Sequence, residues 1–439
     1  MLRTLTRGSV YAVERYLPDP YIFVLILTLV VFAAGMGIEQ QSPLQMVQYW
    51  GDGFWNLLTF GMQMVLVLVT GYVLASSPPF KRLLQALARL ASTPGQAIVL
   101  VTVVSMVAAW INWGFGLVIG ALFARQLAQV VTRVDYRLLI ASAYTGFLVW
   151  HGGLASSVGL VIATEGHFAQ DQIGIIPTSE TIFSSFNLLL VLSILIVIPI
   201  VNRMMMPPDD QAVTVDPQKL ADEEAQAPVT NDRPADRLEN SVILAQAVGL
   251  MGLAFLAYYF IAGKSSLNLN IVNFAFLFLG IVLHGRPSSF LKTVQEAVKG
   301  AGGIVIQFPF YAGIMAMMID SGLAESLSSM FVAASTEVTF PLFTFLSAGV
   351  VNMFVPSGGG QWAVQAPVML DAAERLGVSV PRTAMAVAWG DAWTNMIQPF
   401  WALPALAIAG LNAKDIMGYC LVVLLVSGVI MGAGLMFLP

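Results

Sequence analysis

Long apolar stretches recur along almost the whole chain, and they restrict the folds open to it more than any other feature. A helix needs about 20 mostly apolar residues to cross the hydrocarbon layer of a bilayer. Several stretches are shorter and are broken by Gly and Pro, which is typical of re-entrant hairpins and discontinuous helices. We predict an all-α polytopic membrane protein with apolar segments at Tyr21–Gly37, Phe54–Ser76, Ala97–Ile111, Phe115–Val131, Leu138–Val149, Phe186–Val201, Ser241–Ile261, Ile271–His284, Ile304–Ile319, Phe340–Val355, Ala384–Met396, Trp401–Ala409 and Tyr419–Leu438.

The composition excludes several other classes of protein. Of the 439 residues, 57% are hydrophobic and 10% are charged, whereas about 25% are charged in a typical soluble domain. A soluble fold of this length has too little interior to bury so many apolar side chains. The net charge of −5 does not suggest a nucleic-acid partner. One cysteine, Cys420, and three histidines without the spacing of metal ligands predict neither a metal site nor a cofactor.

One polar segment divides the chain near its middle. Between Arg203 and Glu239 lie nine acidic residues and several prolines, a composition that cannot bury a core. We therefore predict a first membrane repeat over residues 1–202, an acidic solvent-exposed linker over 203–240 and a second membrane repeat over 241–439. The linker is interpreted as a flexible tether, with a regulatory partner site as the alternative.

The first residues are interpreted as an amphipathic segment on the membrane surface. Met1–Tyr16 mixes charged and apolar residues and ends before the Pro18-Asp19-Pro20 turn, so it does not read as a secretory signal. Its three arginines precede the first apolar stretch, and the positive-inside bias then predicts a cytoplasmic N-terminus.

The two membrane halves contain similar interruptions. Asn112–Gly116 and Asn352–Gly360 each follow an apolar run, at an offset of 352 − 112 = 240, and Arg137 and Arg382 precede the next segments at an offset of 382 − 137 = 245. Corresponding Gly/Pro-interrupted segments in two halves indicate the binding site of a transporter. We predict two repeats of inverted topology; parallel repeats, or small residues that only allow close helix packing, are the alternatives.

The interruptions could bind a small anion. A broken helix exposes unpaired backbone N–H groups that carry partial positive charge, and glycines allow a ligand to approach them closely. No Lys or Arg lies in the Gly-rich breaks, which favours a monoanion over a dianion. Nearby tryptophans could form an apolar wall or simply pack. The predicted substrate-binding residues are Asn112, Trp113, Gly114, Asn352, Pro356, Ser357, Gly358, Gly359, Gly360, Gln361, Thr394, Asn395 and Gln398.

Two ionisable residues within apolar segments are candidates for carrying the coupling ion. Such residues are costly in a membrane and are usually functional. Asp391 lies between Trp389 and Trp393, and His151 lies at the first break. The alternatives are a carboxylate that caps or pairs structurally and a structural histidine.

Several stretches spread over nearly the whole chain carry a resemblance to a known family. They are Tyr16–Pro20, Trp50–Leu58, Ile111–Gly116, Gln307–Gly313, Val355–Gly360, Gln398–Ala405 and Asp415–Tyr419. The chain resembles the short-chain fatty acid transporters, the acetoacetate/butyrate permeases of bacteria, within a wider ion-transporter superfamily. The resemblance implies a dimer with inverted repeats, paired re-entrant hairpins and an elevator-like transport domain, with Asn112–Gly114 and Pro356–Gly358 at hairpin tips that face the substrate. His151 departs from the Gly-rich pattern of the family.

These features lead to one functional hypothesis. The chain is predicted to be a homodimeric secondary transporter that takes up acetoacetate, butyrate and similar monocarboxylates across the bacterial inner membrane, coupled to H⁺ or Na⁺. The alternatives are a dicarboxylate or Na⁺/H⁺ carrier, a passive channel and an intramembrane enzyme. An enzyme is disfavoured because the sequence has no Gly-x-Ser-x-Gly elbow, no HExxH motif and no dense His/Asp cluster.

Overall fold

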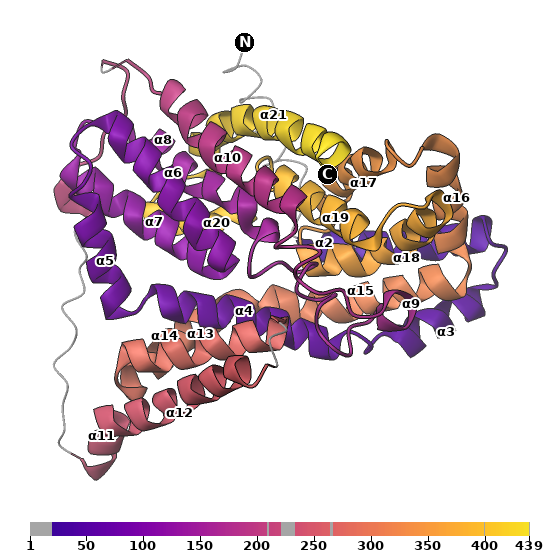
Figure 1. Ribbon diagram of the computed structural model, residues 1–439, viewed down its shortest axis with the longest axis horizontal. Helices are drawn as coiled ribbons and strands as arrows, with labels where there is room; N and C mark the ends of the chain where they lie inside the picture. The colour runs from indigo at the N-terminus through magenta and orange to yellow at the C-terminus, as the bar shows by residue number, and fades with distance from the viewer. Residues whose placement is uncertain (1–19, 209, 221–232, 264–266, 399, 439) are drawn as a thin grey trace.

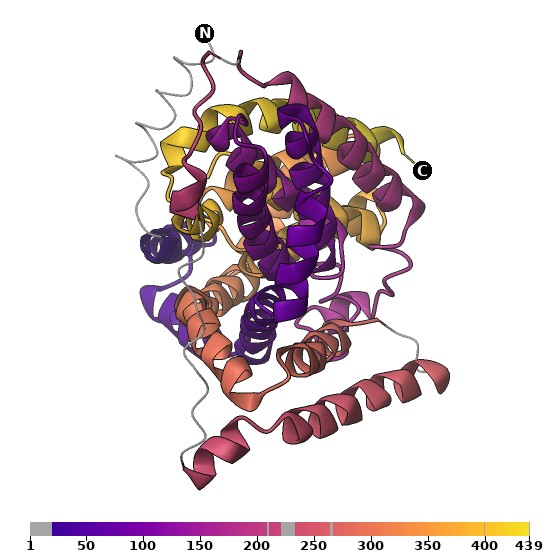
Figure 2. The ribbon, with the colours of Figure 1, turned by 90° about the vertical axis from the view of Figure 1, so that its left-hand side faces the viewer.

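Helices form nearly all of the ordered structure in the described part of the chain. The structure, a computed structural model, describes residues 20–208, 210–220, 233–263, 267–398 and 400–438. The first half contains α2 (Pro20–Gly37), α3 (Pro43–Gly53), α4 (Leu58–Ala75), α5 (Pro78–Ala88), α6 (Pro94–Ile111), α7 (Trp113–Val130), α8 (Tyr136–Tyr144), the 3-10 helix η1 (Thr145–Gly152), α9 (Gln170–Ile173) and α10 (Ser185–Met204). Figures 1 and 2 show their arrangement.

The rest of the chain begins with the acidic segment. It contains η2 (Pro217–Leu220), α11 (Pro234–Glu239), α12 (Val242–Ile261), α13 (Leu269–His284), α14 (Pro287–Val298), η3 (Lys299–Ala301), α15 (Gly302–Asp320), α16 (Leu323–Ala334), α17 (Phe340–Asn352), α18 (Gly358–Leu376), α19 (Val380–Thr394), α20 (Ala402–Ala409) and α21 (Ala413–Phe437). Among the described residues, seven helical segments are long and apolar enough to span a membrane. This supports the all-helical membrane protein that the sequence predicts.

The helix order of the first half recurs in the second at a nearly constant distance. The helices α3 to α8 correspond, in the same order, to the helices α14 to α19. The first residues of corresponding helices are 244 to 246 positions apart, for example 287 − 43 = 244 for α3 and α14 and 340 − 94 = 246 for α6 and α17. At an offset of 245, Asn112 corresponds to Ser357, and both residues are the N-caps of long helices, α7 and α18. The sequence alone pairs Asn112 with Asn352 instead, because only the residue type is visible there.

Two helical hairpins enter the molecule from opposite ends. The α6–α7 hairpin lies in the left half of Figure 1, and α17 and α18 lie in the right half. Their turns meet in the interior, where Trp113 and Ser357 line one cavity. Helix α12 lies at the edge, and Figure 2 shows it below the main body. The core is therefore built around the two turns.

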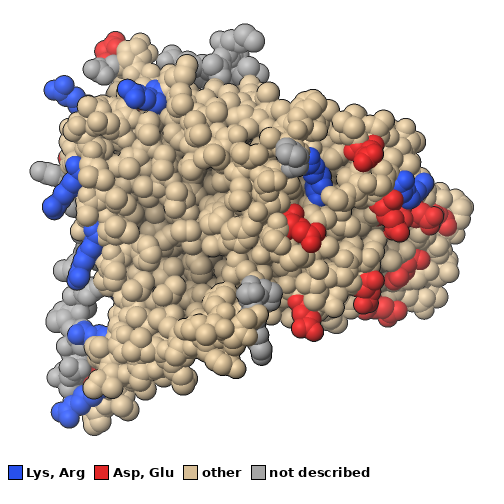
Figure 3. All heavy atoms as spheres, in the orientation of Figure 1, with Lys and Arg blue, Asp and Glu red and all other residues tan. Residues whose placement is uncertain are grey.

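Charged side chains gather at the two ends of the long axis. On the face shown in Figure 3, most Lys and Arg lie along the left edge and most Asp and Glu lie toward the right end, where some basic side chains also lie. The left end includes helix α5, which carries Lys81 and Arg82. At the other end, the turn after α2 meets the turn after α15, where Gln41 donates a hydrogen bond to the carbonyl oxygen of Ser321 at 3.3 Å.

Seven α-helices of the described chain lie outside the predicted apolar segments: α3, α5, α9, α11, α14, α16 and α18. Helices α5 and α14 are short and amphipathic, so their sequences do not read as spans. Helix α16 is also short. Helix α18 was missed because its first turn is Gly358-Gly359-Gly360, a sequence that predicts a break. The actual break occupies residues 353–357, and the glycines form the first turn of the helix that follows.

Part of the acidic linker packs against the first half. Leu220 is 5% exposed, and its carbonyl oxygen accepts hydrogen bonds from Arg125 at 3.0 Å and from Gln129 at 2.6 Å. The backbone N–H of Val213 donates to Asp135 at 2.8 Å. These contacts hold Val213 and Leu220 against the first half, and the division into two repeats and a linker stays a prediction. The predicted amphipathic segment at residues 1–16 lies outside the described residues.

Candidate functional site

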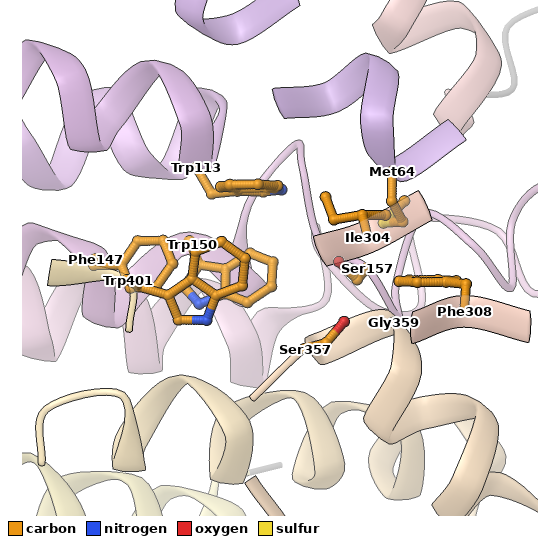
Figure 4. Close-up of a pocket in the computed structure, with 11 residues that line it drawn as sticks. Met64, Trp113, Phe147, Trp150, Ser157, Ile304, Phe308, Ser357, Gly359 and Trp401 are labelled. Carbon is orange, nitrogen blue, oxygen red and sulfur yellow. The ribbon is translucent and has the colours of Figure 1, made fainter. Parts of the chain in front are cut away.

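A small cavity, open on one side, lies where the two halves meet. It is lined by residues from α4, α7, η1, the turn after η1, α15, the start of α18 and the segment before α20: Met64, Trp113, Phe147, Trp150, Ser157, Ile304, Phe308, Ser357, Gly358, Gly359 and Trp401. Figure 4 shows these side chains. Segments far apart in the sequence therefore build one site.

The lining has a side rich in tryptophan and an opposite apolar side. In Figure 4, Trp113, Phe147, Trp150 and Trp401 lie at one side, Met64, Ile304 and Phe308 lie opposite, and Ser157 and Ser357 lie between them. None of the lining residues is acidic or basic. Such a site suits a small ligand with an apolar part and one polar end, because its only polar side-chain groups are neutral.

The first turn of α18 forms part of the cavity wall. The hydroxyl of Ser357 accepts a hydrogen bond from the N–H of Gly360 at 3.3 Å and so caps the helix. The preceding amides of the turn have no partner within the helix and carry partial positive charge. A Cβ added to Gly358 would lie 2.3 Å from Nε2 of His151, and one added to Gly359 would lie 2.7 Å from the Phe60 ring. The glycines are needed here for close packing.

Directly behind Gly358 lies a buried pair formed by both halves of the chain. Nε2 of His151, in η1, is 3.1 Å from Oδ1 of Asp391, in α19, and the two residues are 0% and 1% exposed. The other ring nitrogen of His151 lies 3.3 Å from the hydroxyl of Ser156. Oδ2 of Asp391 is buried and has no hydrogen-bond partner among the described residues. The sequence named both residues separately as ion carriers but did not predict their contact.

A second polar cluster holds the break after α19. The side-chain nitrogen of Asn352 lies within 3.0 Å of the carbonyl oxygen of Asp391, Thr394 Oγ1 and Asn395 Oδ1. The amide of Gln398 donates to Asn395 at 2.6 Å. All four predicted site residues Asn352, Thr394, Asn395 and Gln398 are brought together, but none lines the cavity. These hydrogen bonds hold the non-helical segment after α19 in place, which is a structural role.

Five other predicted site residues are buried or packed near the cavity without lining it: Asn112, Gly114, Pro356, Gly360 and Gln361. Asn112 caps α7 by accepting a hydrogen bond from the N–H of Phe115 at 2.9 Å. Gln361 donates to the carbonyl oxygen of Ala348 at 2.8 Å. Of the predicted substrate-binding residues, Trp113, Ser357, Gly358 and Gly359 line the cavity.

Sequence reasoning missed the apolar side of the cavity that lies opposite the tryptophans. Met64, Ile304 and Phe308 lie within ordinary apolar segments, so their types carry no signal. The available hints are Pro309, which follows Phe308 and interrupts the hydrogen bonding of α15, and the Gln307–Gly313 stretch of the family resemblance. Among the described residues, no group of three or more His, Cys, Asp or Glu side chains is positioned to hold a metal ion.

Comparison with known proteins supports a transport role. The sequence model of the family described as short chain fatty acid transporter matches residues 1–438. A protein of Escherichia coli, named as a candidate short-chain fatty acid transporter, is 47% identical over 437 residues, which cover 99% of each chain. A protein of Haemophilus influenzae with the same name is 43% identical over 447 residues, which cover 100% of each.

Solved structures share the fold at low identity. The YdaH transporter of Alcanivorax borkumensis, whose topology is described as unusual, aligns with a TM-score of 0.63 and 18% identity over 95% of this chain and 98% of its own. MtrF of Neisseria gonorrhoeae, described among antimetabolite efflux pumps, aligns with a TM-score of 0.52 and 14% identity over 98% and 97%. At these identities the likeness concerns the fold alone.

Proposed function

The chain belongs to the short-chain fatty acid transporter family and is an integral membrane protein, and from this premise we propose that it is a secondary carrier that takes up short-chain monocarboxylates together with protons. The observation that carries the proposal is the uncharged cavity between the two halves, with the His151–Asp391 pair directly behind its wall.

The cavity lining favours a monocarboxylate over a dicarboxylate. The turn that opens α18 attracts one anionic group, whereas the opposite side, with Met64, Ile304 and Phe308, offers only apolar contacts. A second carboxylate would lose its hydration there and gain no partner, which is strongly unfavourable. A short alkyl chain gains from the same surroundings.

The buried pair provides a site for the coupling proton. His151 and Asp391 can share a proton, and two cavity-lining residues, Gly358 and Trp150, pack directly against the imidazole. A carboxylate bound at the first turn of α18 would attract a protonated imidazole through an interior of low dielectric constant. Anion and proton would therefore bind more tightly together than apart, which is the requirement for symport.

The arrangement of helices supports alternating access by inverted repeats. The constant offset between α3–α8 and α14–α19, and hairpins that enter from opposite ends, are what two inverted repeats would produce. We propose that the hairpins move together as an elevator-like domain. In the bacterial inner membrane, the positive-inside bias would orient the end that carries the basic α5 toward the cytoplasm.

The proposal extends to a homodimer, as the family resemblance implies. Light scattering of the purified protein in detergent measures the mass of the protein component and is expected to give twice 47.2 kDa. A mass of one chain under conditions in which the protein transports would refute this part.

Transport in proteoliposomes tests the main proposal. Labelled butyrate should accumulate when an inward proton gradient is imposed, and an excess of unlabelled acetoacetate should compete better than succinate. Accumulation driven only by a sodium gradient would refute proton coupling, and stronger competition by succinate would refute the monocarboxylate assignment.

A substitution at the buried pair tests its role. Asp391→Asn should abolish gradient-driven accumulation while butyrate exchange across the membrane continues. Asp371→Asn is the matched control, because Asp371 lies in α18, its side chain is 36% exposed and it accepts a hydrogen bond from the hydroxyl of Ser328. An Asp391→Asn carrier that still accumulates butyrate against its gradient would exclude an obligatory role of this carboxylate.

A further inference from the structure

Two buried indole groups in the cavity lack hydrogen-bond partners. Trp113 and Trp150 are 4% and 2% exposed, both line the cavity, and neither Nε1 has a partner among the described residues. Leaving a buried donor unpaired is unfavourable, and few such groups occur in folded proteins. An acceptor supplied by a ligand would remove this cost.

Trp113 and Trp150 differ in position from the other tryptophans that have an unpaired buried nitrogen. Trp50, Trp110 and Trp362 also have an unpaired buried nitrogen in the described part of the chain, but none of them lines the cavity. Trp113 and Trp150 contact each other edge to face with ring centres 6.1 Å apart. In Figure 4 the nitrogen of Trp113 is at the end of the ring that points toward Met64 and Ile304, into the cavity.

Other neutral donors line the same space. The hydroxyls of Ser157 and Ser357 lie between the tryptophan-rich side and the opposite apolar side in Figure 4, and the first turn of α18 begins at Ser357. A carboxylate has about four lone-pair positions and can accept several hydrogen bonds at once. The cavity therefore offers neutral N–H and O–H groups in the number that a single carboxylate needs, and no cation.

Resting on the proposed function, we infer that the carboxylate of the substrate is bound by the indole N–H groups of Trp113 and Trp150, with the hydroxyls of Ser157 and Ser357 and the first amides of α18. The alkyl chain extends toward Met64, Ile304 and Phe308. Tryptophans that pattern analysis treats as an apolar wall thus act as the anion-binding residues.

Replacement of each indole by a phenyl ring tests this assignment. Trp113→Phe and Trp150→Phe keep an aromatic ring but remove the donor. Since a hydrogen bond to a charged group contributes about 1.5–3 kcal/mol, each variant should bind butyrate at least about tenfold more weakly. Scintillation proximity binding of labelled butyrate to the purified carrier measures the affinity.

A neutral analogue separates carboxylate recognition from general damage. Competition by butyramide, which has the same chain but no charge, should change far less than competition by butyrate. Trp362→Phe is the matched control, because it removes an unpaired, fully buried indole N–H outside the cavity. Unchanged butyrate affinity in both cavity variants, or equal weakening of both ligands, would overturn the inference.

The serine variants keep the test decisive if a tryptophan variant fails to fold. Ser157→Ala should weaken butyrate binding by about threefold or more, whereas Ser142→Ala, which removes an unpaired buried hydroxyl outside the cavity, should not. Equal affinities for the two serine variants would contradict the assignment. A wild-type carrier that binds no butyrate would refute the proposed function itself, which is a different outcome from tight butyrate binding that the substitutions leave unchanged.

Discussion

The substitution Gly358→Ala places one methyl group between the cavity and the buried pair. The new Cβ would lie 2.3 Å from Nε2 of His151 and 2.8 Å from the indole of Trp150. Ordinary contacts begin at 3.4 Å, so the imidazole would have to move by roughly 3.4 − 2.3 = 1.1 Å. Because both rings are buried and packed, there is little space for this movement.

Movement of the imidazole would affect the hydrogen bond between His151 and Asp391. Nε2 is the atom that lies 3.1 Å from Asp391, so a shift of this size would disturb the geometry of that hydrogen bond. Overpacking of a well-packed core costs about 1–3 kcal/mol, and a lost buried hydrogen bond costs about the same. If this free-energy cost destabilises the substrate-bound state relative to the empty carrier, butyrate affinity or proton-driven accumulation should fall by about 5- to 150-fold.

Uptake of labelled butyrate into proteoliposomes under a proton gradient, with initial rate and final accumulation measured separately, tests this reasoning. Gly302→Ala is the control, because Gly302 is also in the first turn of a long helix, α15, and an added Cβ would meet nothing within 4 Å. Both variants should elute as folded protein. A folded Gly358→Ala carrier with wild-type affinity and accumulation would refute the proposed connection between the cavity wall and the pair.

Three further substitutions test the scaffold. Asn352→Ala leaves the carbonyl oxygen of Asp391 and other buried acceptors unpaired, so the thermal midpoint in detergent should fall by an amount that reflects about 1–3 kcal/mol; an unchanged midpoint would contradict this. Asp135→Ala removes the acceptor for the N–H of Val213, so limited proteolysis within 211–220 should become faster, and equal rates would count against docking of this stretch. Tyr144→Phe removes a 2.7 Å hydrogen bond to the chain after α19 and should cost about 1 kcal/mol, measured as the same midpoint.

Hydropathy along the chain already determined that the protein is helical and lies in a membrane. A chain with 57% hydrophobic residues in stretches of helical length has no other way to satisfy both its side chains and its backbone. Local motifs also located the helix interruptions. Asn112 and Ser357 are good N-caps, and the structure places a helix start directly after each of them.

Only the tertiary structure decided which of these residues share a site. His151 and Asp391 are 240 residues apart and touch because η1 and α19 pack together. Met64 and Phe308 face the cavity while their neighbours do not, and nothing in an apolar run marks that difference. The patterns that a sequence displays are set by neighbours three or four residues away along a helix, whereas a binding site depends on which helix faces pack together, and those distant contacts are decided by the fold.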